Sequence, residues 1–133
     1  PRLGEGMFRY YADAGDFERK LAVCDRALQL ASTQPALAVV TGVTRSYVEL
    51  CRRIFAVADL FATADLTLLS NQNELVEMVG LLEQAGEENV AAIRVWRQSL
   101  GPEPWAYRVY DAIEATEGTV ADIRDHIAHC YLY

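Results

Sequence analysis

The sequence predicts an all-α protein in which antiparallel helical hairpins form a compact bundle or a short α-solenoid of about seven helices. The four prolines stand at positions 1, 35, 102 and 104, so none interrupts the long stretches between them, where proline would break a helix. Within those stretches apolar residues recur every three or four positions, as on one helix face. A chain of 133 residues that is 52% hydrophobic can bury a sufficient core unaided, so residues 1–133 are expected to form a single domain.

Two helices are expected before the second proline, at residues 3–14 and 17–31, with a break at Gly15. Asp16 is suited to cap the second helix by accepting a backbone hydrogen bond in its first turn. The first helix carries Leu3, Met7 and Tyr11 on one stripe. The stripe of the second consists of Phe17, Leu21, Cys24, Leu28 and Ala31.

Residues 36–63 are expected to form the most buried part of the fold, either as one helix or as two with a joint at Gly42. Pro35 is favourable in the first turn of such a helix. The apolar stripe is again spaced by threes and fours: Val43, Tyr47, Leu50, Ile54, Val57 and Phe61.

Four further helices are expected in the second half of the chain, at residues 71–85, 87–100, 104–117 and 119–130. Gly86 and Gly118 are predicted to end helices, and the Gly-Pro pair at 101–102 is a strong stop. Asn71 with Glu74, and Thr119 with Asp122, have the spacing of helix-capping pairs.

Composition limits the functional class and the compartment. A formal net charge of −7 argues against nucleic acid as a partner, because a basic face supplies most of that affinity. Cys24, Cys51 and Cys130 form no CxxC pair, which favours a reducing, intracellular compartment, either cytoplasm or an organelle matrix. The longest apolar run, residues 54–69, is interrupted by two aspartates, so no transmembrane span is expected.

One cluster has residue types that could bind a metal: Asp122, Asp125, His126, His129 and Cys130. Asp122, His126 and His129 can share one face of a helix. Both histidines of the chain lie within one turn, however, and no distant residue completes a site. We therefore expect no metal, no cofactor and no catalytic residue, and the protein is expected not to be an enzyme.

Three short stretches resemble known families. Tyr11, residues 15–18 and residues 27–28 resemble one hairpin of a tetratricopeptide repeat, which implies a protein-binding solenoid. Residues 37–38, 42–45 and 48 resemble the helix-turn-helix of bacterial regulators. Residues 31–35 and 82–90 resemble the helical effector domain of GntR-family regulators. That last resemblance implies small-molecule sensing, with the family's metal site lost because Asp25 and Asn73 or Val76 stand about where histidines are expected.

The function expected from the sequence is that of a non-enzymatic interaction or structural subunit of a larger protein assembly, either an oligomer or a hetero-complex. Tyrosine and tryptophan are enriched at protein interfaces, and they gather near both ends of this chain. The candidate partner-binding residues are Tyr10, Tyr11, Arg45, Arg52, Trp105, Tyr107, Tyr131, Leu132 and Tyr133. The alternative is a small-molecule-sensing effector domain of a GntR-type regulator. That alternative needs a cavity, whereas an interaction subunit needs an exposed apolar patch.

Overall fold

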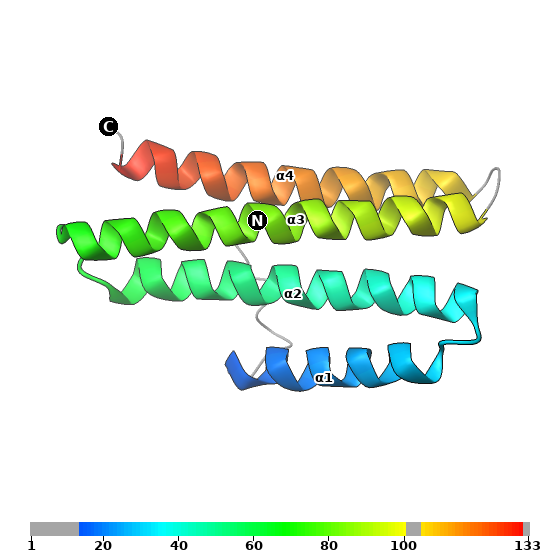
Figure 1. Ribbon diagram of the computed structural model, residues 1–133. Helices are drawn as coiled ribbons and strands as arrows, with labels where there is room; N and C mark the ends of the chain where they lie inside the picture. Colours follow the sequence, from blue (N-terminus) through cyan, green and yellow to red (C-terminus); the bar gives the residue numbers. More distant parts are fainter. Residues whose placement is uncertain (1–13, 101–104, 132–133) are drawn as a thin grey trace.

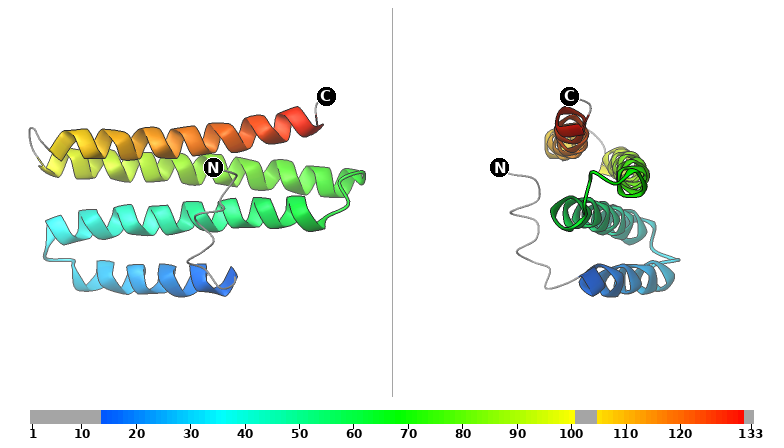
Figure 2. Two further views of the ribbon diagram at one scale, coloured as in Figure 1. Left: turned by 180° about the vertical axis from the view of Figure 1, so that it is seen from behind. Right: turned by 90° about the vertical axis from the view of Figure 1, so that its left-hand side faces the viewer.

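The structure is a computed structural model that describes residues 14–100 and 105–131, and within these ranges the chain folds as an up-and-down array of helices (Figure 1). The helices are α1 (Ala14–Leu30), α2 (Pro35–Thr63), α3 (Leu69–Leu100) and α4 (Trp105–Tyr131). Each helix packs against the next one in the chain, and neighbours run antiparallel (Figure 2). The all-α class and the antiparallel hairpins are thus confirmed.

The expected number of about seven helices is wrong, since the described residues form four. Gly15, Gly42, Gly86 and Gly118 all lie inside helices, and residues 36–63 belong to one continuous helix. A glycine inside a helix costs only about 1 kcal/mol relative to alanine, which the packing of long helices can offset. The first expected helix, residues 3–14, lies outside the described residues except for Ala14.

The two predicted capping pairs also lie inside helices. Asn71 is in the first turn of α3, and its side-chain amide donates a hydrogen bond to the Asp65 carbonyl at 2.8 Å. The hydroxyl of Thr119 donates to the Ala115 carbonyl one turn earlier, also at 2.8 Å. Both polar side chains therefore bond to backbone carbonyls, whereas a helix cap would accept from backbone amides.

The true helix boundary before α3 is a short turn around Asp65. The Asp65 carboxylate accepts hydrogen bonds from the hydroxyl of Thr67 at 2.7 Å and from its backbone amide at 3.1 Å. These two bonds hold the pKa of Asp65 below its ordinary value. The turn thus satisfies its own polar groups and lets α3 return along α2.

Helix α2 is the central element, as expected, because it contributes to two separate apolar clusters. Toward α1 it packs Val48 and Cys51 around the fully buried Phe17, and the rings of Phe17 and Phe55 lie 5.5 Å apart. Toward α3 and α4 it contributes to the largest cluster, which consists of Leu50, Ile54, Val57, Leu75, Leu82, Ala85 and Ile123. A third cluster joins α3 to α4 through Val90, Ile93 and Ile113.

Three of the six residues in the predicted core stripe of α2 are buried, Val43 and Phe61 are partly buried, and Tyr47 is exposed. Leu50, Ile54 and Val57 are almost inaccessible, whereas the side chain of Tyr47 is 46% exposed. Tyr47 lies at the edge of the stripe, on the side of α2 where no described helix covers it fully. That edge is part of the candidate functional site.

Candidate functional site

The two sides of the α1–α2 hairpin differ in their side chains. One side carries a cluster of arginines, Arg45, Arg52 and Arg53. The Glu49 carboxylate accepts hydrogen bonds from Arg52 at 2.7 and 3.0 Å and from Arg53 at 3.0 Å. Burial alone would raise the pKa of Glu49, but the two guanidinium groups outweigh burial and lower it. One carboxylate therefore holds two arginines in place on the surface of α2.

The same side of the hairpin carries an ion pair between the helices. Nε of Arg45 lies 2.5 Å from Oδ1 of Asp25, and this hydrogen bond raises the pKa of Arg45. The three arginines line a groove of about 310 Å³ between α2 and α3, together with Leu21, Glu49, Leu81, Gln84, Ala85 and Glu88. Arg45 and Arg52, both predicted as partner-binding residues, are thus brought together in one groove, where each is paired with a carboxylate of this chain.

The opposite side of the hairpin carries several exposed hydrophobic side chains. Residues two apart on a helix lie about 200° apart around its axis, so Val23 and Tyr47 point away from the side where Asp25 pairs with Arg45. Leu30 and Val40 lie seven residues from Val23 and Tyr47 and share their directions. All four side chains are exposed, as is Leu37 beside the turn between the helices. We call Val23, Leu30, Leu37, Val40 and Tyr47 the apolar face.

The apolar face contains a large share of the exposed hydrophobic side chains of the described residues. Nine large hydrophobic residues are exposed among all the described residues, and the five from Val23 to Tyr47 form the apolar face. Partial burial of the Tyr47 hydroxyl and its interaction with Cys51 raise the pKa of Tyr47 to about 12. The Tyr47 hydroxyl is therefore neutral at physiological pH.

A groove between α2 and α4 adjoins the apolar face at Tyr47. It has a volume of about 430 Å³ and is lined by Val43, Thr44, Tyr47, Leu50, Asn89, Ile93, Ala112, Ala115, Thr116 and Thr119. At its floor the buried Asn89 donates to the Ser46 hydroxyl at 2.9 Å and accepts from the Thr116 hydroxyl at 2.8 Å. This chain of hydrogen bonds joins α2, α3 and α4 at one level of the bundle.

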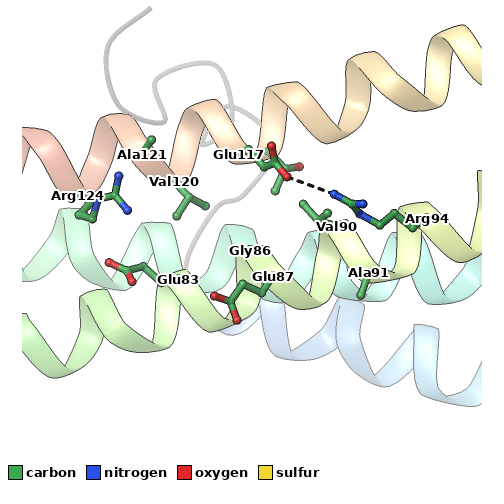
Figure 3. A pocket seen from close by; sticks show the side chains of 11 residues that line it. Glu83, Gly86, Glu87, Val90, Ala91, Arg94, Glu117, Val120, Ala121 and Arg124 are labelled. Carbon is green, nitrogen blue, oxygen red and sulfur yellow. Dashed lines mark ion pairs between the residues drawn. The ribbon is translucent and has the colours of Figure 1, made fainter.

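A further groove lies between α3 and α4 on another side of the bundle (Figure 3). Its volume is about 330 Å³, and Arg94 and Glu117 face one another across it at 3.7 Å. A Cβ atom on Gly86 would lie 2.6 Å from Cγ2 of Val120. Gly86 therefore allows α3 and α4 to approach closely, which gives this glycine a packing role inside a continuous helix.

Most of the aromatic candidates cannot be placed. Tyr10, Tyr11, Leu132 and Tyr133 lie outside the described residues, and Trp105, Tyr107 and Tyr131 belong to α4 without described side chains.

The apolar face was not predicted from the sequence. A signal was present, since Val23 with Leu30 and Val40 with Tyr47 repeat at seven-residue spacing.

The histidine cluster of α4 lies on the exposed side of that helix as far as its side chains are described. The ring of His126 lies 5.8 Å from the ring of Phe61 on α2, and Arg124 lies 3.5 Å from Asp125. In the described part of the chain, no group of three or more histidine, cysteine or acidic side chains is arranged to hold a metal ion. His129 and Cys130 are in α4, but their side chains are not described.

Cys24 and Cys51 are both buried, as expected for small hydrophobic residues on helix stripes. Across the described ranges, no helix combines the length and apolar character needed to cross a bilayer.

No protein-family model matches the chain, and no curated protein or solved structure is significantly similar to it.

Proposed function

We propose that the protein is a non-enzymatic helical subunit that binds another protein through the apolar face of α1 and α2. The observation that carries this proposal is that five of the exposed large hydrophobic side chains of the described residues lie on the α1–α2 hairpin. Scattered exposed hydrophobic residues are normal on a soluble surface, but a contiguous apolar patch is typical of an interaction site.

The spacing of the apolar face fits a helix of the partner. Val23 with Leu30, and Val40 with Tyr47, each span two helical turns, or about 10 Å. An apolar row of this length is what the apolar stripe of an amphipathic helix packs against. The partner's own apolar stripe would then bury the side chains that water now surrounds.

The arginine cluster plays a different part in this proposal. Arg45 and Arg52 lie on the other side of the hairpin from the apolar face, so one docked helix would not reach both surfaces. Arg45 pairs with Asp25 of α1 and so links the two helices, whereas Arg52 pairs with Glu49 on α2 itself. Partner binding by these two arginines remains a prediction from the sequence, as does the absence of catalysis.

A small-molecule-sensing effector domain is the second candidate, and the α2–α4 groove favours it. A volume of about 430 Å³ falls within the range of ligand pockets, which are mostly apolar with a few polar groups. Asn89 and Thr116 are such groups at the floor of this groove. A metabolite that raises the melting temperature of the full chain, but not that of Asn89→Leu, would favour this candidate.

The test compares two valines that are equally exposed. Val40 lies in the apolar face and Val95 lies on α3 outside it, and both are 50% exposed. Lysine at either position should leave folding intact, because surface substitutions change stability by about 0.5 kcal/mol or less. The full chain, Val40→Lys and Val95→Lys are expressed in the source organism with a tag, and co-purifying proteins are quantified.

The proposal predicts a stoichiometric partner with the unaltered chain and with Val95→Lys, and loss of most of that partner with Val40→Lys. Equal recovery from both variants, or equal loss from both, would contradict it. Circular dichroism of the two purified variants provides the folding control.

A further inference from the structure

The apolar face is bordered by basic side chains on α1, and we propose that its partner is an amphipathic helix with acidic residues along one flank of the apolar stripe. Val23 and Leu30 form one row on α1. Arg19 and Arg26 are also seven residues apart and form a second row, which we call the basic row. The two arginines lie about 40° and 60° around the helix from Val23 on one flank, and Lys20 lies about 60° away on the other. All five residues are exposed, so an apolar row lies between basic side chains.

The acidic residues of α1 do not cancel this charge. Glu18 and Asp25 lie about 140° and 160° around the helix from Val23, so both are on the far side of α1. Asp16 shares the direction of Val23 and forms an ion pair with Arg19. The side of α1 that carries Val23 therefore has three basic residues and one acidic residue.

The α2 part of the apolar face has no charged residue. In residues 35–48 only Arg45 is charged, and it lies on the other side of the hairpin, where it pairs with Asp25. The turn before α2, residues 31–34, is also uncharged. Positive charge is therefore confined to the α1 edge of the face. A complementary partner helix has acidic residues beside α1 and uncharged residues beside α2.

The basic row is a local feature of a chain whose net charge is −7. At physiological ionic strength, exposed charges more than about 8 Å apart are largely screened. A docked helix therefore interacts with the basic row more strongly than with acidic residues elsewhere on the protein. Basic side chains on the same flank of the partner would place like charges together, which opposes binding.

An anionic membrane matches the apolar face less well than an acidic helix does. Segments that bind anionic lipid headgroups carry clusters of about four to eight lysine or arginine residues, whereas this side of α1 has three. The negative net charge of the whole chain also opposes approach to a negative lipid surface.

Two synthetic helical peptides test the charge preference of the full chain. Both have the same leucine stripe over about three heptads, and the positions along one flank are glutamate in the first peptide and lysine in the second. Binding of each labelled peptide is measured by fluorescence anisotropy. At about 50 mM NaCl, where screening is weak, the glutamate peptide should bind at least about tenfold more tightly than the lysine peptide. This ratio of affinities should fall at about 500 mM NaCl.

Arg26→Glu should lower the ratio of affinities by at least about threefold, because it reverses one charge of the basic row. Arg94→Glu is the matched control. Arg94 is also an exposed arginine, but it lines the separate α3–α4 groove, so the same change in net charge there should leave the ratio unaltered. Circular dichroism checks that both variants are folded. Equal ratios for the two variants would contradict the role of the basic row.

The acidic character of the partner rests on the proposed function, and Val40→Gln separates the two. Glutamine removes apolar contact without adding charge, so it should weaken the binding of both peptides. Equal affinity of the two peptides for the unaltered chain, with both weakened by Val40→Gln, would overturn the acidic partner and leave the apolar face as a docking surface. Binding of neither peptide would also overturn the acidic partner, while the comparison of Val40→Lys with Val95→Lys would still decide the proposed function.

Two further results would identify another occupant and overturn the acidic helix, and we expect neither. One is cosedimentation of the chain with vesicles of phosphatidylserine and phosphatidylcholine in equal parts, but not with phosphatidylcholine alone, which would indicate a membrane. The other is a dimer of the unaltered chain in analytical ultracentrifugation that Val40→Gln dissociates, which would indicate a second copy.

Discussion

Gly86→Ala should destabilise the protein, although alanine is the better helix former. Gly86 is buried in the middle of α3, and an added Cβ would lie 2.6 Å from Cγ2 of Val120 on α4. Valine is stiff because both methyl groups are attached at Cβ, so Val120 cannot simply rotate its side chain away. Either this side chain or the separation of α3 and α4 has to change.

The magnitude follows from two opposing effects. Alanine in place of glycine stabilises a helix interior by about 1 kcal/mol. Overpacking by one methyl group in a closely packed interior costs about 1–3 kcal/mol. The net loss for Gly86→Ala is therefore about 0–2 kcal/mol. Gly80 provides the control on the same helix, because it is exposed and a Cβ there meets no atom within 4 Å; Gly80→Ala should gain the full ~1 kcal/mol.

The assay is urea unfolding of the two variants, followed by circular dichroism at 222 nm, the usual wavelength for helix content. The reasoning predicts that Gly86→Ala is about 1–3 kcal/mol less stable than Gly80→Ala, and that Val120→Ala narrows this difference. If both glycine variants are stabilised equally, the close approach of α3 and α4 is not what Gly86 provides.

Three further predictions concern the core and its polar groups. Leu50→Ala and Ile54→Ala should each reduce the free energy of unfolding by about 2–5 kcal/mol, because both side chains are almost fully buried; losses below about 1 kcal/mol in urea titrations would contradict the burial. Asn89→Ala should cost about 1–3 kcal/mol, since it removes the amide that bonds the buried Thr116 hydroxyl and the partly buried Ser46 hydroxyl, and a neutral result in thermal unfolding would show that water replaces the amide. The pKa of Glu49 is lowered from 4.5, so its stabilising effect is complete above that pH and is lost as the pH falls through the folded-state pKa. Glu49→Gln should therefore flatten the acid-side decline in stability, and an unchanged decline would contradict this.

Local sequence patterns predicted the helices and their buried faces well because periodicity reflects burial directly. Phe17, Leu21 and Cys24 are all buried on α1, as their spacing indicates. The breaks between helices were predicted poorly. A glycine that ends a helix and a glycine that admits a neighbouring helix both lack a side chain, and at Gly86 the difference is made by Val120, which is far away in the sequence.

The candidate site was harder to predict than the fold for a related reason. Tyr47 satisfies the apolar spacing of α2, but whether such a residue is buried depends on which helix lies opposite. Arg45 and Arg52 were predicted from the sequence as partner-binding residues, and the structure adds the pairing of Arg45 with Asp25 on another helix. That ion pair depends on the tertiary packing of α1 against α2, which spacing within one helix cannot specify.

Site-specific photo-crosslinking in the source organism tests the proposed interaction most directly. A photoreactive phenylalanine analogue is placed at Val40 in the apolar face or at the equally exposed Val95, and the adducts are identified by mass spectrometry. The proposal predicts one discrete adduct with a defined protein from position 40 and none from position 95. No adduct from position 40, or the same set of adducts from both positions, would contradict the proposal that the apolar face binds a partner.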